Sequence, residues 1–150
     1  DTVCLKALAS FPEKPDYVSI ESEKVSFSKL VEEISLLRQL GYIEFKAVQQ
    51  AGISHQKEPN PSKEGVYAGH HFIEGSSGLF GSDLSGNWKN ETEILDQYKL
   101  IFRQYEWFGD HGVLTRTVAG KALRSLLRKL LRSPLPGWYD THAKHSSAAS

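Results

Sequence analysis

Two adjacent histidines followed by a carboxylate are the first residues whose types could do chemistry. His70 and His71 lie in a run of strand-forming residues, and Glu74 follows them. Histidine titrates near neutral pH, so either ring is a candidate general acid or base, with Glu74 as its carboxylate. On a strand, however, the two histidines would point to opposite faces, and His70 and Glu74 would lie about 13 Å apart. We therefore expect any catalytic partner to come from another part of the chain, and a structural role for the histidines is the competing interpretation.

A glycine- and serine-rich segment from Gly75 to Gly86 comes next. Backbone N–H groups in such segments can bind phosphate. No Lys-Ser or Lys-Thr pair follows to open a helix, and the glycine spacing does not match a dinucleotide-binding turn. The segment is therefore predicted to be a shaped loop that binds no nucleotide.

The remaining nucleophiles and metal-binding residue types form no recognisable set. Cys4 is the single cysteine, which excludes an internal disulfide and a thiolate metal cluster. The spacing of His55, His142 and His145 completes no metal-ligand pattern. Asp110 and His111 stand between glycines, where a tight turn is the simpler interpretation. We expect neither a metal site nor a cofactor.

Large aromatic residues support an alternative, in which the chain binds an apolar small molecule or cofactor. Binding pockets are lined mainly by apolar and aromatic side chains with a few polar groups. Five aromatic residues are the candidate lining: Phe72, Phe80, Trp88, Phe102 and Trp107.

The clearest functional pattern is a basic amphipathic helix predicted from Ala119 to Ser133. Leucines recur at three- and four-residue steps, and no acidic residue occurs between Asp110 and Asp140. Five cations on this helix are the candidate partner-binding residues: Lys121, Arg124, Arg128, Lys129 and Arg132. The favoured partner is a protein with an acidic surface, because the first part of the chain is itself acidic and no nucleic-acid-binding motif is present. Nucleic acid and an anionic membrane surface are the alternatives.

These residues must be positioned by elements that the apolar periodicity predicts. Phe27, Leu30, Ile34 and Leu37 lie on one face of a predicted helix from Ser26 to Leu40. Gly41 is suited to end that helix, and alternation then predicts a strand from Tyr42 to Val48. Tyr17 to Ile20 is a shorter predicted strand.

Later elements are less clear in the sequence. Val66 to Ile73 is predicted to be a strand, and Asn90 with Glu93 forms a capping box for a helix ending near Phe102. A hairpin from Tyr105 to Val118 is expected to follow. In the alternative, the helix continues through the aromatic run at 99–108.

Together these elements predict one α+β domain. A small, mostly antiparallel sheet is covered by two or three helices, including the basic C-terminal one. Residues 1–140 form the domain, and residues 141–150 are expected to be a polar, flexible tail. No apolar run approaches the roughly 20 residues that span a bilayer, so a transmembrane protein is not expected.

The sequence as a whole favours a function that involves no catalysis. The chain has 150 residues with 18 basic and 18 acidic side chains, one cysteine and no methionine. The cysteine content mildly favours a reducing compartment, and the missing initiator indicates a processed or truncated start. No complete catalytic set emerges, so the leading hypothesis is an interaction or assembly subunit that docks an acidic partner. A small-molecule binder and an enzyme using His70 or His71 are the alternatives.

Overall fold

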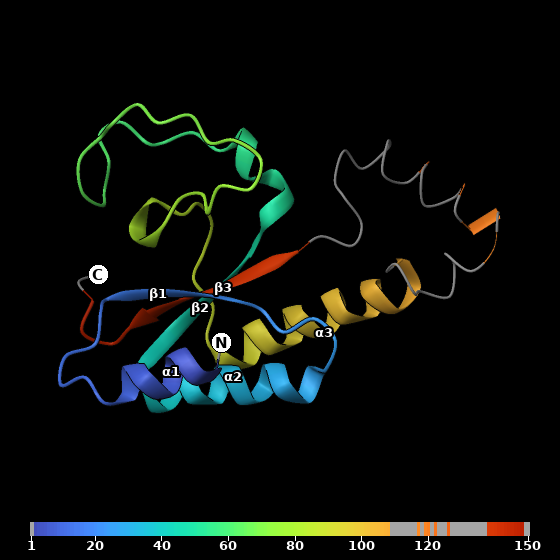
Figure 1. Cartoon of the computed structure of the whole chain (residues 1–150), viewed down its shortest axis with the longest axis horizontal. Coiled ribbons are helices and arrows are strands. Elements are labelled where there is room, and N and C mark those ends of the chain that lie inside the picture. Colours follow the sequence, from blue (N-terminus) through green and yellow to red (C-terminus); the bar gives the residue numbers. More distant parts are fainter. Residues whose placement is uncertain are drawn as a thin grey trace.

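A three-stranded antiparallel sheet is the centre of the structure, a computed structural model that describes residues 2–108, 117, 119, 120, 122, 126 and 138–148. Its strands are β1 (Tyr17–Glu21), β2 (Tyr42–Gln49) and β3 (Tyr139–His145). The order is β1-β3-β2, so the strand that comes last in the chain lies in the middle (Figure 1). Both neighbours run antiparallel to it.

Three α-helices cover one face of this sheet: α1 (Thr2–Ala9), α2 (Phe27–Gln39) and α3 (Glu91–Phe108). The core lies between the helices and the sheet, and no buried residue of this cluster comes from the 50–89 segment. Its fully buried side chains include Leu30, Ile34, Leu37, Tyr42, Phe45, Ile94 and Ala143. The predicted α+β class is confirmed. Among the described residues, no helix combines the length and apolar character needed to cross a membrane.

The α2–β2 unit follows directly from local sequence. Ser26 caps α2 by accepting a hydrogen bond from the Lys29 backbone N–H, and Gly41 follows the helix with φ +96°. A side chain at Gly41 would be strained there and would collide with the His145 ring. The predictions of a helix over 26–40 and of strands over 42–48 and 17–20 are confirmed.

The capping box predicted for α3 is present. Asn90 Oδ1 accepts from the Glu93 N–H, and Glu93 Oε2 accepts from the Asn90 N–H, both at 3.0 Å. The helix does not end near Phe102 but continues to Phe108. Phe102 packs edge-on against Phe27 and Tyr105, so the apolar face of the helix extends into the aromatic run. The predicted hairpin is therefore wrong for residues 105–108, and nearly all of its remainder lies outside the described residues.

The other face of the sheet carries the long segment 50–89. It contains two short 3₁₀ helices, Gln50–His55 and Gly81–Asp83. The predicted strand from Val66 to Ile73 is wrong, because this stretch has only an isolated bridge between Lys57 and His71. Its backbone donors bind a carboxylate instead of a neighbouring strand: the Ala68 and His70 N–H groups donate to Glu58.

The expected flexible tail is also wrong, because β3 supplies the centre of the sheet. Thr141, His142 and Ala143 are all buried. The polar Thr141 can be buried here because its hydroxyl is paired. Thr141 Oγ1 lies 2.8 Å from Ser22 Oγ and 2.6 Å from the Tyr98 hydroxyl. Of the predicted basic helix, the described residues Ala119, Gly120, Ala122 and Leu126 are helical, and its cations lie outside the described residues.

Candidate functional site

The sheet face opposite the helices carries polar side chains from β1 and β3. Alternation along a strand places Ser19 and Glu21 of β1 on this face, together with Asp140 and His142 of β3. In the strand register Ser19 is opposite His142, and Glu21 is opposite Asp140. Two polar pairs therefore lie side by side beneath the 50–89 segment.

The first pair joins Ser19 to a buried, neutral histidine. Ser19 Oγ lies 3.2 Å from His142 Nε2, and His142 is only 2% exposed. Burial, and then the charge of Lys46, lower the pKa of His142 to about 4. Its Nδ1 has no hydrogen-bond partner among the residues that the structure describes.

This pair is not arranged as an activated nucleophile. A serine nucleophile needs a histidine that can take up its proton, usually with a carboxylate on the other ring nitrogen to stabilise the imidazolium. Here no described carboxylate contacts the other ring nitrogen, and the Lys46 charge opposes protonation. The Lys46 ammonium is fixed nearby, since it donates to the Leu84 carbonyl at 2.8 Å and lies 4.4 Å from the centre of the Trp88 ring.

The second pair brings two carboxyl groups together. The Ser22 N–H donates to the Tyr139 carbonyl and the His145 N–H donates to Asp16, so the hydrogen-bonded positions of β1 are the even-numbered residues. Glu21 and Asp140 consequently form a non-hydrogen-bonded pair, in which opposite side chains approach most closely. Burial, and then Glu21, raise the pKa of Asp140 to about 6. Lys24 Nζ lies 3.6 Å from Glu21, whereas the Asp140 carboxylate has no hydrogen bond or ion pair within the described part of the chain.

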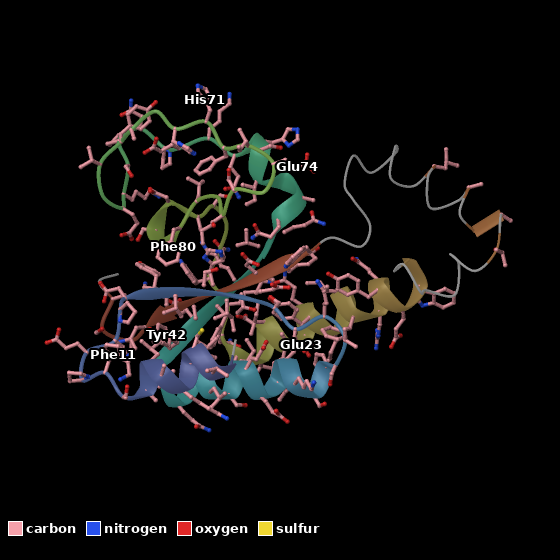
Figure 2. The ribbon with its side chains drawn as sticks, in the orientation of Figure 1. Phe11, Glu23, Tyr42, His71, Glu74 and Phe80 are labelled. Carbon is pink, nitrogen blue, oxygen red and sulfur yellow. The ribbon has the colours of Figure 1, made fainter. Side chains whose placement is uncertain are left out.

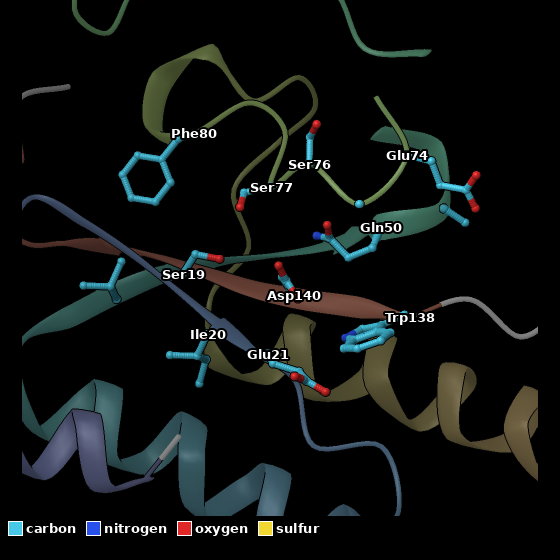
Figure 3. A pocket seen from close by; sticks show the side chains of 13 residues that line it. Ser19, Ile20, Glu21, Gln50, Glu74, Ser76, Ser77, Phe80, Trp138 and Asp140 are labelled. Carbon is cyan, nitrogen blue, oxygen red and sulfur yellow. The ribbon is translucent and has the colours of Figure 1, made fainter. Parts of the chain in front are cut away.

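An open cleft of about 900 Å³ lies beside these carboxyl groups (Figure 3). Residues 18–21, 50–51 and 74–77 line it, together with Phe80, Trp138 and Asp140. Trp138 lies near Glu21 at one end of the cleft, and Phe80 lies at the other. The described lining contains three carboxylates and no Lys, Arg or His, so its charge favours a cationic or hydrogen-bond-donating ligand.

The structure separates the predicted catalytic residues. His71 lies at the outer end of the 50–89 segment, far from the sheet, and is exposed (Figure 2). The His70 ring packs edge-on against Phe72, and His70 is also exposed. Of the three candidates only Glu74 lines the cleft. No carboxylate within the described residues accepts a hydrogen bond from either histidine ring, so the arrangement does not favour an acid–base role for them.

The five predicted ligand-binding aromatics do not form one pocket. Phe80 lines the cleft and packs against Tyr17, which also stacks on Trp88 at 5.6 Å. Phe102 and Trp107 are on α3, on the opposite side of the sheet. Phe72 contacts His70 in the long segment. Only Phe80 of this set is a lining residue, and the predicted partner-binding residues Lys121, Arg124, Arg128, Lys129 and Arg132 lie outside the described residues.

Sequence reasoning missed Ser19, Glu21, Asp140 and His142 as site residues. The last two were assigned to the boundary of a tail, because Tyr139 to His145 has little apolar character. The available signal is weak alternation, since Asp140, His142 and Lys144 are strongly polar and the intervening Thr141 and Ala143 are smaller. In the described residues, no group of three or more His, Cys, Asp or Glu is arranged to hold a metal ion.

Comparison with known proteins leaves the site to be interpreted from its geometry. No protein-family model, curated protein or solved structure matches this chain.

Proposed function

We propose that this chain binds a small organic molecule that has an apolar body and a cationic amine. The Asp140 carboxylate carries the proposal, because it is half-buried in the wall of a largely apolar cleft and has no hydrogen bond or ion pair in the described structure. Glu21 opposite it adds a second negative charge. Two like charges directly opposite across a strand pair destabilise a sheet, and a bound cation would relieve that repulsion.

An ammonium group already contacts two of the lining residues, Trp138 and Glu21. Lys24 Nζ is 4.1 Å from the centre of the Trp138 ring and 3.6 Å from Glu21. An aromatic face next to a carboxylate is a favourable environment for an amine. Lys24 pairs with Glu21, and no cation within the described residues pairs with Asp140.

Binding of a matched pair of small probes tests the proposal. Phenethylamine and 2-phenylethanol have similar apolar bodies and differ in charge. In NMR titrations we expect phenethylamine to shift the amides of residues 18–21 and 138–140, and to bind about tenfold more tightly than the alcohol. Asp140→Asn should remove that preference. Glu44→Gln is the control, because Glu44 pairs with Lys144 outside the cleft. Equal binding of both probes, or binding of neither, contradicts the proposal.

A second proposal is docking of an acidic protein partner through the basic residues of 119–133. Its support is the charge pattern, since the sequence from 111 to 139 contains no acidic residue. Leu126 is 54% exposed among the described residues of this stretch. Clustered positive charges attract an acidic surface over several ångströms and accelerate association.

A further inference from the structure

The outer edge of β1 has a row of backbone groups without partners. Because the even-numbered residues of β1 pair with β3, the N–H and C=O groups of Tyr17, Ser19 and Glu21 point away from the sheet. None of them has a backbone partner within the described residues. A row of alternating donors and acceptors in extended geometry matches one kind of partner, another β-strand.

The opposite edge of the same sheet is protected. The Phe45 N–H donates to the Lys89 carbonyl at 2.7 Å, and the Lys89 N–H donates back at 2.9 Å. The β2–β3 pairing also contains an irregularity between Tyr42 and Glu44. Bulges and covering segments of this kind block edge pairing, whereas the Tyr17–Glu21 sequence has no proline, lysine or bulge.

The cleft follows this unprotected edge. Neighbouring residues of a strand point to opposite faces, yet Val18, Ser19, Ile20 and Glu21 all line it. The cleft is therefore bounded by the β1 backbone as well as by the Ser19 and Glu21 side chains, next to the edge that has no neighbour in the described residues.

The first helix, which shares a core cluster with Val18 and Ile20 of β1, is also incompletely covered. In Figure 1, α1 lies in front of α2. Apart from Thr2, Lys6 is the one polar residue of α1, and Leu5 is buried in the core. Val3 is nevertheless 77% exposed, and Cys4 and Ala7 are exposed too. A helix that is apolar on most sides is typically buried on most sides.

We propose that β1 pairs with a strand of another polypeptide segment, in which apolar and basic residues alternate. Residues beside Val18 and Ile20 would continue the apolar layer over α1 and must be apolar themselves. Residues on the other face lie beside Ser19 and Glu21, where the cleft carries three carboxylates, so a Lys or Arg is complementary. A second copy of β1 fits less well, because Tyr17–Glu21 offers no cation. This strand pairing does not depend on the binding of a small molecule.

Amide hydrogen exchange measures, for each residue of β1, whether its N–H is hydrogen-bonded. In the 150-residue chain alone, we expect the amides of Val18 and Ile20 to be protected and those of Ser19 and Glu21 to exchange rapidly. A short peptide of alternating Val and Lys should protect Ser19 and Glu21. A peptide of alternating Val and Glu should protect them at least about tenfold less at equal concentration.

A proline substitution at a β1 residue whose N–H points away from β3 distinguishes pairing with an added strand from folding of the sheet itself. Ser19→Pro removes an N–H that does not bond to β3, so the sheet should still fold, with the amides of Val18 and Ile20 protected. The Val/Lys peptide should bind this variant at least about tenfold more weakly than it binds the original chain. Ser19→Ala is the matched control, because it also removes the hydroxyl next to His142 and keeps the N–H. Ser19→Ala should bind the peptide at least about tenfold more tightly than Ser19→Pro does.

Three results would overturn the proposal. The first is protection of Ser19 and Glu21 in the free chain at dilutions where sedimentation shows a monomer. The second is a dimer of this chain that Ser19→Pro dissociates, which would assign the edge to a second copy. The third is an absence of added protection with the Val/Lys peptide.

Discussion

Glu21 and Asp140 lie directly opposite each other in the β1–β3 pair, with both carboxyl groups at the wall of the cleft. Such a like-charge pair opposes folding when both groups are ionised. The fold therefore contains a local electrostatic cost at the wall of an open cleft, and perturbed ionisable groups of this kind are common at binding sites.

The first prediction concerns Asp140→Asn. The pKa of Asp140 is raised from 3.8 to about 6 in the folded chain, so the folded state binds the proton more tightly than the unfolded state. This group therefore makes stability fall as pH rises from about 4 to about 6. The variant should be more stable than the original chain at pH 7, by about 1 kcal/mol after allowance for solvent screening, and equally stable below pH 4. Urea unfolding at the two pH values measures this, with Glu44→Gln as the control. Equal stability at pH 7 would contradict the assignment.

The second prediction concerns His142→Gln, whose pH dependence has the opposite sign. The pKa of His142 falls from 6.5 to about 4 on folding, so the unfolded state binds the proton more tightly. This group makes stability rise with pH between about 4 and 6.5, by on the order of 3 kcal/mol. Removing it should leave the falling contribution of Asp140 visible, whereas Asp140→Asn should leave the rising contribution of His142.

Unfolding free energies across pH 3.5 to 8 for both single variants and the double variant separate the two groups. The double variant should have the flattest profile in this window. Ser19→Ala is the control for the lost hydrogen bond at Nε2. A profile for His142→Gln that still rises from pH 4 to 6.5 would assign the rise to another group.

Local patterns predicted those parts of the fold whose determinants are close together in sequence. The helix over 26–40 depends on a cap and an apolar stripe, and α3 begins at a capping box. The end of α3 depends on a contact between Phe102 and Phe27, which are far apart in sequence. Periodicity alone could not distinguish that continuing helix from a hairpin.

The site could not be predicted because β3 has no apolar signature. Ser22 and Tyr98 supply hydroxyl partners for the buried Thr141, and burial lowers the pKa of His142 so that its ring is neutral. Ser22 directly follows β1 and Tyr98 is in α3, so both partners of Thr141 are more than 40 residues away from it in sequence. Val66 to Ile73 is the converse case, since a strand-forming sequence is held as a loop by the Glu58 carboxylate.

The third prediction tests β3 as the centre of the sheet. Tyr98→Phe removes a hydroxyl that lies 2.6 Å from both Ser22 Oγ and Thr141 Oγ1, and should cost about 1–2 kcal/mol of unfolding free energy. Ser22 and Thr141 stay paired with each other at 2.8 Å, which limits the loss. Tyr67→Phe, on an exposed tyrosine, is the matched control.

Truncation tests the same role of β3 through loss of the whole fold rather than through a small change in unfolding free energy. A chain ending at residue 138 lacks the strand that joins β1 to β2. It should lose the strand signal in circular dichroism and the cooperative thermal transition. A truncated chain that melts like the original would mean that residues 139–148 behave as the tail that their composition indicated.

The last prediction concerns the basic residues of the proposed docking helix. Lys121, Arg124 and Arg128 are spaced three and four residues apart, so in a helix they form one stripe, separate from the leucines between them. Reversing all three to Glu should change the melting temperature little, because exposed charges contribute little to stability. The same reversal should weaken binding to an acidic protein surface. Raising the salt concentration should also weaken binding of the original chain.

Polyglutamate-coated beads provide a defined acidic surface for this measurement. The control is a variant with Lys6, Lys14 and Lys29 changed to Glu, which has the same change in net charge. If both triple variants lose binding equally, the interaction reflects net charge alone. If reversal at 121, 124 and 128 instead lowers the melting temperature and leaves binding intact, the stripe stabilises the acidic part of its own chain, and the docking proposal is wrong.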